Sequence, residues 1–373
     1  MPMTAKVGLR TTSARLVAHL LAGLLICTGV AVAQPASTSP SSAGGRAFTV
    51  GPVTAPPGAK VSGRLDVPAG VDAATFVPIT VVNGRRSGPT LAIIAGIHGS
   101  ETTPILALQN LVTRLDPEAL TGTVVLVHVA NIPSFLGRSI YVSPVDRKNL
   151  NRQFPGRADG TVSERIAHVL HRDVLTVADA VIDVHSGDAN EDLRPWTGYY
   201  ARYGAEDVIR RSREMAVAFG LEYVVEFPFS PKPDEPTLYT GSTAVRMGKP
   251  AFDVEVGRRG QIEPANTALI VDGLLDVARH LGMLAGSPRP RAATTFVTGR
   301  HYLETEHDGL FYPLVKAGDT VEKGAPLGYV TDFFGRRVQD LTAPASGIVL
   351  VIVATPAVNQ GDEIVTLATA FRR

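Results

Sequence analysis

The segment Leu-Ala-Ile-Ile-Ala-Gly-Ile-His-Gly-Ser-Glu, residues 91–101, joins a strongly apolar run to a glycine-flanked turn that carries an imidazole and a carboxylate. Two later segments have the same form: the apolar run at 180–184 ends in His185, and the run at 251–254 ends in Glu255. Short apolar runs bounded by turn residues are typical of buried strands. Three strand ends therefore each deliver a side chain that is able to bind or assist a metal ion.

The order of these runs predicts the fold class. From Thr90 to about Gly286, apolar strands alternate with amphipathic stretches in a βαβ rhythm, which indicates an α/β fold with a mixed sheet flanked by helices. Functional residues gather beyond the strand ends of such sheets, so side chains from several strands converge on one crevice. We expect helices near 104–115, from 164 onward, at 206–219 and at 267–284.

The residue types predict a zinc site. A catalytic zinc ion takes three protein ligands and keeps a fourth position open for water. His98 and Glu101 stand three residues apart in the first turn, so a distant segment must supply the third ligand, and His185 fits that role. The alternative for the first pair is ordinary capping of the next helix. We predict one Zn²⁺ per chain on these three residues, with Glu255 as a spare carboxylate.

Four motifs in order resemble the succinylglutamate desuccinylase and aspartoacylase family, which belongs to the wider zinc carboxypeptidase fold. They are Gly-x-His-Gly-x-Glu at 96–101, Asn-Leu-Asn-Arg at 149–152, Asp-Val-His-Ser-Gly at 183–187 and Asp-Val-Glu-Val-Gly at 253–257. The resemblance covers roughly residues 90–282. It implies a zinc carboxypeptidase-like sheet and a zinc-bound water that Glu255 deprotonates before it protonates the leaving amine.

The resemblance also implies substrate-binding residues. Asn151 and Arg152 match the pair that binds the substrate carboxylate in this family, and the planar fork of arginine suits that task. The chain departs from aspartoacylases at Asn149, where they have Asp, so the acid-binding details stay open. Arg147 is a candidate to polarise the scissile carbonyl, although a solvated charge run explains it equally well. Tyr239 lies in a Pro- and Gly-rich loop and either donates to a tetrahedral intermediate or simply packs.

The N-terminus has the pattern of an export signal. Residues 1–33 combine a basic head, an apolar stretch and the small-residue site Ala31-Val32-Ala33. We predict cleavage, an exported protein that is periplasmic or secreted, and a flexible leader at 34–47; an uncleaved anchor helix is the alternative. No membrane span is predicted after the signal. Cys27, the single cysteine, lies inside the signal, which leaves the mature chain without disulfides or thiolate metal sites.

The charge balance argues against other partner classes. The sequence has 36 Lys and Arg against 35 Asp and Glu, and three of the basic residues lie in the signal. A nearly neutral mature chain gives no reason to expect nucleic acid or an anionic membrane as a partner. The expected partner is a small carboxylated amide, and the oligomeric state does not follow from the sequence pattern.

The length predicts two domains. We place a catalytic domain at 48–287, beginning with a β segment at 48–89, and a small all-β domain at 288–373. The second resembles the barrel-sandwich domains of biotinyl and lipoyl carriers. Carriers modify a hairpin lysine, but the segment 340–347 contains no lysine. We therefore expect an accessory cap or packing module, which the resemblance to desuccinylase-like enzymes also implies.

These features predict an exported zinc-dependent amidohydrolase that deacylates N-acyl amino acids or similar small carboxylated amides. An extracytoplasmic zinc carboxypeptidase that acts on short or cell-wall peptides uses the same metal chemistry and is the first alternative. A non-catalytic binding protein on the same scaffold is the second. It is disfavoured because the base and all three ligands occur together and because the carrier lysine is missing.

Overall fold

The computed structural model describes residues 45–228, 235, 237–289 and 293–373. The predicted signal and all but the last three residues of the predicted leader lie outside this part of the chain. The described residues belong to one compact unit. None of their helices is both long enough and apolar enough to cross a membrane.

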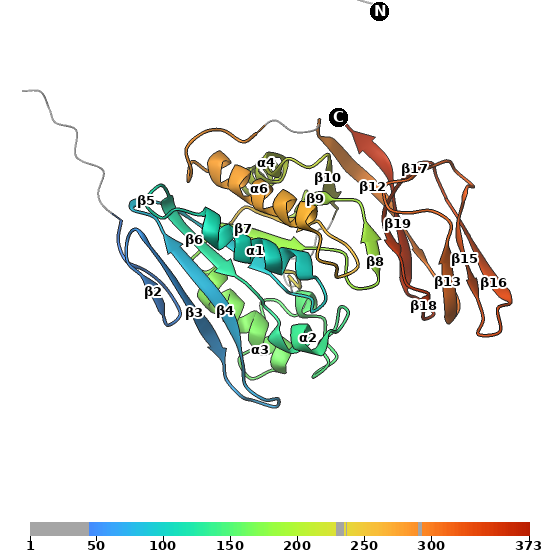
Figure 1. Ribbon diagram of the computed structural model, residues 1–373, viewed down its shortest axis with the longest axis horizontal. Coiled ribbons are helices and arrows are strands. Elements are labelled where there is room, and N and C mark those ends of the chain that lie inside the picture. Colours follow the sequence, from blue (N-terminus) through green and yellow to red (C-terminus); the bar gives the residue numbers. More distant parts are fainter. Residues whose placement is uncertain (1–44, 229–234, 236, 290–292) are drawn as a thin grey trace, which may run out of the picture. The chain divides into compact units, whose positions relative to one another are not determined.

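Strands dominate the described chain (Figure 1). Those before residue 260 are β1 (Phe48–Val50), β2 (Val53–Ala55), β3 (Ala59–Val67), β4 (Thr75–Asn83), β5 (Arg86–Ala95), β6 (Thr121–Val127), β7 (Ala180–His185), β8 (Glu191–Leu193), β9 (Trp196–Tyr200), β10 (Tyr223–Phe227) and β11 (Ala251–Glu255). Those after it are β12 (Thr295–Glu304), β13 (Gly309–Pro313), β14 (Thr320–Val321), β15 (Pro326–Thr331), β16 (Arg337–Thr342), β17 (Gly347–Val353), β18 (Ala357–Val358) and β19 (Glu363–Arg372).

One long mixed sheet joins most of these strands. Its hydrogen-bonded order is β14-β17-β19-β12-β10-β9-β11-β7-β5-β6-β4-β3, and β8 pairs with β17 beside this path. Strands β5, β7 and β11 are neighbours and run parallel. Their carboxyl ends therefore meet at one edge of the sheet, as the sequence predicted for the three apolar runs.

The helices agree with the expected α/β pattern. They are α1 (Thr102–Arg114), α2 (Ile132–Gly137), α3 (Val162–Val169), α4 (Glu206–Phe219), α5 (Thr240–Arg246) and α6 (Pro264–His280), with a 3₁₀ turn at Leu150–Arg152 and a π-helical turn at Leu170–Leu175. The four helices expected from the sequence are confirmed: α4 has the expected bounds, and the ends of α1, α3 and α6 are shifted. Helices α2 and α5 were not predicted from the sequence, because both are short.

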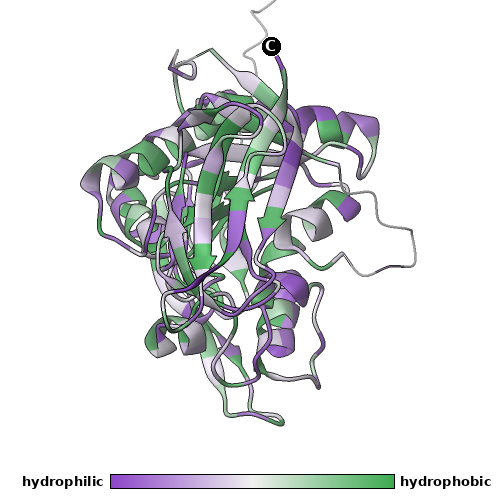
Figure 2. Ribbon diagram, turned by 90° about the vertical axis from the view of Figure 1, so that its right-hand side faces the viewer, coloured by the Kyte–Doolittle hydropathy of each residue, from purple (hydrophilic) through white to green (hydrophobic). Residues whose placement is uncertain are grey.

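Strand alternation decides which face carries the chemistry, because successive side chains point to opposite faces. Ile182 and Val184 of β7 pack in the apolar core with α1, α4 and α6, whereas Val181 packs in the core with α3 and α5. Asp183 and His185 share the parity of Val181, so they point to the side of α3 and α5. Figure 2 shows both apolar and hydrophilic segments along the strands.

The C-terminal strands form the additional β region that the sequence predicted. Phe311, Leu327 and Val349 belong to its separate apolar core, and β13, β15, β16 and β18 form a second sheet of four strands. Two pairings tie the region to the rest of the chain: β12 runs parallel to β10, and β17 runs antiparallel to β8. The proposed domain boundary after residue 287 stays a prediction.

Candidate metal centre and active site

The predicted metal ligands come together at the carboxyl edge of β5, β7 and β11. His98 and Glu101 lie in the turn between β5 and α1, and His185 is the last residue of β7. Glu255 is the last residue of β11 and is paired in register with His185. The parallel register thus places the spare carboxylate beside the third ligand.

Two glycines allow the turn to fold this tightly. Gly96 has a φ of +71°, in the left-handed region that favours glycine. A Cβ on Gly99 would lie 2.1 Å from the carbonyl oxygen of Ser134, which is too close for any side chain. The close approach of α2 to the turn therefore requires glycine at position 99.

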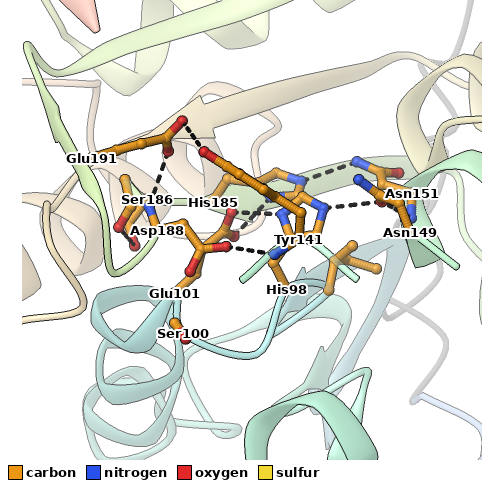
Figure 3. A network of polar contacts seen from close by, with 12 residues as sticks. His98, Ser100, Glu101, Tyr141, Asn149, Asn151, His185, Ser186, Asp188 and Glu191 are labelled. Atoms are coloured by element: carbon orange, nitrogen blue, oxygen red, sulfur yellow. Dashed lines mark hydrogen bonds and ion pairs between the residues drawn. The ribbon is translucent and has the colours of Figure 1, made fainter. Parts of the chain in front are cut away.

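Both candidate histidine ligands lie next to the carboxylate of the third candidate, Glu101 (Figure 3). The Nδ1 atom of His98 lies 2.6 Å from Glu101 Oε1, and the Nδ1 atom of His185 lies 2.8 Å from Glu101 Oε2. One ligand atom from each residue lies within 4.8 Å of the other two. Glu101 and His185 are buried. The Nδ1 atoms and the carboxylate therefore face a common point, as ligands of one cation would.

Outer partners fix the orientation of both imidazoles. The Nε2 atom of His185 lies 3.0 Å from Asp183 Oδ2, and the Nε2 atom of His98 lies 3.1 Å from Asn149 Oδ1. Both oxygens can accept a hydrogen bond from Nε2, and each Nδ1 turns inward, toward Glu101. Metal-binding histidines usually donate their second nitrogen in this way. A two-histidine, one-carboxylate set with these supports fits zinc.

The electrostatics of the cluster follow from the shared carboxylate. Burial alone would raise the pKa of Glu101, but the adjacent His185 and His98 outweigh it and hold the pKa at about 2. Burial lowers the pKa of His185, yet Asp183 and Glu101 raise it well above the ordinary value. Glu101 is thus ionised at neutral pH, and a bound cation would replace the protons that it attracts to the imidazoles.

Glu255 differs from its neighbours because its carboxylate makes no hydrogen bond to another described residue. Its side chain is partly exposed. Burial raises its pKa well above the usual range; His185 opposes this shift, and Glu101 and Glu191 add to it. A carboxylate without a committed partner and with a raised pKa is suited to take up and release a proton.

The structure separates the roles expected for Asn151 and Arg152. Asn151 is buried: its Nδ2 donates to Asp183 Oδ2 at 3.4 Å, and its Oδ1 accepts from the backbone N–H of Thr240 at 3.0 Å. Arg152 is exposed, donates from Nη1 to the carbonyl of Asn151 at 2.9 Å and stacks 4.5 Å from the centroid of Tyr239. Only the guanidinium is presented to a ligand.

The two weaker candidates lie in different surroundings. Tyr239 is half-buried, precedes α5 and contacts Arg152 and Tyr200. Arg147 is exposed on a turn with a φ of +57°, and its backbone N–H donates to Ser143. Within the described residues, the Arg147 side chain makes no hydrogen bond or ion pair with the candidate metal ligands.

The structure places at the site a second group of polar residues that the sequence analysis did not predict. The Tyr141 hydroxyl donates to Glu191 Oε1 at 2.5 Å, and its backbone N–H donates to Asp188 Oδ2 at 3.0 Å. The Tyr141 ring meets the His98 ring edge-on at 6.2 Å between centroids. Burial raises the pKa of Glu191 to about 7. Asp188 follows the His185 motif closely, but no pattern marked Tyr141 or Glu191.

Comparisons with known proteins identify relatives of this chain. Residues 87–281 match the family model described as the succinylglutamate desuccinylase/aspartoacylase catalytic domain. The N-alpha-acetyl-L-2,4-diaminobutyric acid deacetylase of Halomonas elongata is 33% identical over 279 residues, which cover 72% of this chain and 79% of that protein.

Solved structures show the same likeness. The product-bound ectoine utilization protein EutE (DoeB) of Ruegeria pomeroyi superposes with a TM-score of 0.74 and 29% identity, covering 83% of this chain and 95% of that chain. A succinylglutamate desuccinylase of Silicibacter sp. TM1040 superposes with a TM-score of 0.73 and 28% identity, covering 83% and 94%.

Proposed function

Because this chain belongs to the succinylglutamate desuccinylase/aspartoacylase family, we propose that it is a zinc-dependent amidohydrolase that removes the acyl group from N-acyl amino acids. The observation that carries the proposal is the inward orientation of two Nδ1 atoms and one carboxylate, with the unpartnered carboxylate of Glu255 beside them. Amide hydrolysis at a metal site requires a neighbouring group that takes up a proton and gives it back.

In this proposal one Zn²⁺ per chain is held by His98, Glu101 and His185. When bound there, zinc supplies Lewis acidity that polarises the amide carbonyl and makes water more acidic. Asp183 and Asn149 keep the two imidazoles in the tautomer that exposes Nδ1.

Glu255 is the proposed base. Its carboxylate takes the proton from the attacking water and passes it to the departing nitrogen, which is otherwise a poor leaving group. Its raised pKa supports both halves of this task. A carboxylate of ordinary pKa would hold the proton too weakly to serve as the acid at neutral pH.

Arg152 is the proposed anchor for the substrate carboxylate because its guanidinium is exposed and oriented by Tyr239. Asn151 supports this anchor and the Asp183–His185 pair rather than offering free donors of its own. Tyr239 borders the substrate space. Arg147 stays the weakest member of the predicted substrate set.

The substrate class follows from the size of the neighbouring space. The cavity that Asp253 borders has a volume of about 350 Å³, and Arg300 and Tyr302 of β12 form part of its wall. A space of this size suits a small N-acyl amino acid better than a peptide. The relative from Halomonas elongata is named for an N-acetylated amino acid.

We also propose that the protein is exported, on the N-terminal pattern of residues 1–33.

The test is amine release by purified, zinc-loaded protein from a panel of N-acyl amino acids and short peptides, with a chelator-treated sample as the control. Chelator-sensitive cleavage of acyl amino acids is the expected result. Cleavage of peptides alone would favour the carboxypeptidase, and cleavage of neither class would count against the hydrolase.

A further inference from the structure

A tyrosine beside the candidate metal centre has a backbone conformation that calls for an explanation. Tyr141 has a φ of +55°, in the left-handed region that bulky residues rarely adopt. Asp188, which is buried, accepts the backbone N–H of Tyr141 at 3.0 Å and holds the chain in this conformation. Strained backbone that buried groups hold in place is often found at active sites. The conformation therefore points to a role for the Tyr141 side chain.

The Tyr141 side chain lies against the candidate metal centre (Figure 3). Its ring meets the imidazole of His98 edge-on, and its hydroxyl lies 2.5 Å from Glu191 Oε1. Tyr141 and His98 are both partly buried, whereas the ligands Glu101 and His185 are buried. The tyrosine thus lies next to the ligand that solvent reaches, which is the side from which a substrate can approach.

Glu191 fixes the position of the tyrosine hydroxyl. Its Oε1 accepts the hydroxyl of Tyr141, and its Oε2 accepts the backbone N–H of Asp188 at 3.0 Å. Strand β8 begins at Glu191 and pairs antiparallel with β17, where Glu191 lies opposite Val353. The C-terminal β region therefore supports the residue that holds the tyrosine.

The Tyr141 hydroxyl remains a hydrogen-bond donor in these surroundings. Burial and the adjacent Glu191 raise the pKa of Tyr141 far above its ordinary value, so the hydroxyl keeps its hydrogen. Burial also raises the pKa of Glu191 to about 7. A protonated Glu191 can donate to the tyrosine oxygen, which releases the hydroxyl hydrogen for another acceptor. Each bond in such a chain polarises the next, and the terminal donor becomes stronger.

The proposed reaction needs a donor at this place. Amide hydrolysis develops negative charge on the former carbonyl oxygen, and enzymes stabilise this charge with oriented hydrogen-bond donors. The sequence offered Arg147 for this task, but its exposed side chain makes no hydrogen bond or ion pair with the candidate metal ligands within the described residues. Arg152 is held elsewhere, by the carbonyl of Asn151 and the ring of Tyr239. Tyr141 lies where the predicted Arg147 contact is missing.

We propose that the Tyr141 hydroxyl binds the oxyanion of the tetrahedral intermediate and that Glu191 is the positioning residue that orients it. The inference rests on the proposed function, because it concerns the same hydrolysis. In that step the water oxygen adds to the carbonyl carbon, and the π electron pair moves to the carbonyl oxygen. Tyr141 donates a hydrogen bond to this oxygen and keeps its proton, while Glu255 carries the proton of the water to the departing nitrogen.

Tyr141→Phe is the decisive variant, because it removes the hydroxyl and keeps the ring against His98. In the full-length, zinc-loaded protein, kcat should fall about 100- to 1,000-fold with KM nearly unchanged, the effect of losing one donor that acts only in the transition state. Zinc content, measured on the same sample, should equal that of the wild type.

An inhibitor gives a readout that is independent of turnover. A phosphonamidate analogue of the N-acyl amino acid that the wild type cleaves fastest places a phosphoryl oxygen where the oxyanion would form. Tyr141→Phe should weaken binding of this analogue by about the factor lost in kcat, since a transition-state analogue reports the same contacts. Binding of the product amino acid, which has no such oxygen, should not change.

Tyr199→Phe is the matched control. Tyr199 also donates to a glutamate, Glu226, at 3.0 Å, but it packs in the apolar core with Ile182, on the face of the sheet away from the metal ligands. This variant should have the kcat of the wild type.

Variants of Glu191 test whether it acts through the tyrosine. Glu191→Ala should lower kcat about as much as Tyr141→Phe, and the double variant should lose no more than either, because both changes remove one contact. Glu191→Gln should recover most of the kcat, since its amide N–H can donate to the tyrosine oxygen. A merely structural role of Glu191 would give additive losses instead.

Three results would overturn the proposal: the kcat of the wild type in Tyr141→Phe, additive losses in the double variant, or equal weakening of product and analogue binding. Tyr141→Phe decides the question by itself if Glu191→Ala does not fold. If the wild type cleaves no amide, the proposed function fails and this inference fails with it. If the wild type is active and Tyr141→Phe is equally active, only the role of Tyr141 is wrong.

Discussion

In each of the two histidines, Nδ1 faces Glu101 and Nε2 contacts an outer partner. The role of the outer partner is testable. His185 turns Nδ1 toward Glu101 because its Nε2 is held by Asp183. Asp183→Asn should weaken zinc binding by about 10- to 100-fold, the usual effect of losing an outer partner. Competition with a chelator measures this affinity. Asp188→Asn is the control, since Asp188 holds the backbone of Tyr141 and Ala189 instead; an equal loss there would contradict the assignment.

The proton-transfer role of Glu255 gives a second prediction. Glu255→Gln keeps the shape of the side chain and removes its basicity, so turnover should fall at least about a hundredfold while zinc content stays at the wild-type level. Turnover and bound zinc are measured on the same preparation. Glu222→Gln, at an exposed carboxylate paired with Arg194, is the control. Wild-type turnover in the Glu255 variant would remove this residue from the mechanism.

A site residue could be predicted from the sequence where the residues next to it already carried the signal. His98, Glu101, His185 and Glu255 each follow an apolar run, so strand ends alone predicted their convergence, and the structure brings them together. The sequence did not choose between Asp183 and Asp188 as the partner of His185, because Asp188 lies in the connection after β7 and its position depends on how that connection folds.

Other site residues had no local signal at all. Tyr141 reaches the centre through a bond to Glu191, 50 positions later, and Arg300 reaches the cavity from a different region of the fold. Their positions result from packing between distant elements, and the sequence around each one resembles an ordinary loop or edge strand.

At the scale of elements, helix α3 anchors the loop that carries the Asn-Leu-Asn-Arg motif. Thr161 and Glu164 form a capping box at its start, and Glu164 also forms an ion pair with Lys148 at 3.0 Å. Asp146 accepts the backbone N–H and the hydroxyl of Ser163, both at 2.9 Å. The motif is therefore held in place by the N-terminus of a helix that follows it.

Glu164→Ala tests this anchor. The backbone N–H of Thr161 and the ammonium group of Lys148 hold the pKa of Glu164 at about 2, below the ordinary 4.5. A lowered pKa stabilises the fold above about pH 4.5, and this contribution is lost as the pH falls toward 2. The variant should lose about 1 kcal/mol of stability at pH 7, and the difference from wild type should shrink by pH 3. Thermal unfolding at both pH values measures it; a constant difference would contradict the electrostatic part.

The strands show which elements the sequence pattern predicted and which it did not. The apolar strands β5, β7 and β11 were predicted from composition, whereas β9 was not. It lies between β10, to which it runs parallel, and β11, to which it runs antiparallel. Its Trp-Thr-Gly-Tyr-Tyr sequence is typical of a loop near a site as much as of a strand. Its pairing is determined by neighbours that are remote in sequence.

At the scale of the whole molecule, the two predicted domains share a sheet and one buried apolar cluster. Strand β12 extends the sheet beyond β10, with Tyr223 opposite Thr295. Trp196 and Val225 from the catalytic part pack in one buried cluster with Val297 and Leu350 from the C-terminal part. An interface of this kind couples the stability of both parts, because neither can unfold without exposing apolar surface and a strand edge of the other.

We therefore expect a single unfolding transition in calorimetry, with equal calorimetric and van't Hoff enthalpies. A chelator-treated sample is the control, because a bound metal would stabilise one part selectively; it should shift the transition without splitting it. A chain ending at Ser287 should aggregate, since it exposes the edge of β10. Two resolved transitions, or a soluble and cooperatively folded chain ending at Ser287, would instead establish the independent domains that the sequence predicted. The same result would separate Arg300 and Tyr302 from the catalytic fold, so the cavity that both residues border depends on the cohesion of the sheet.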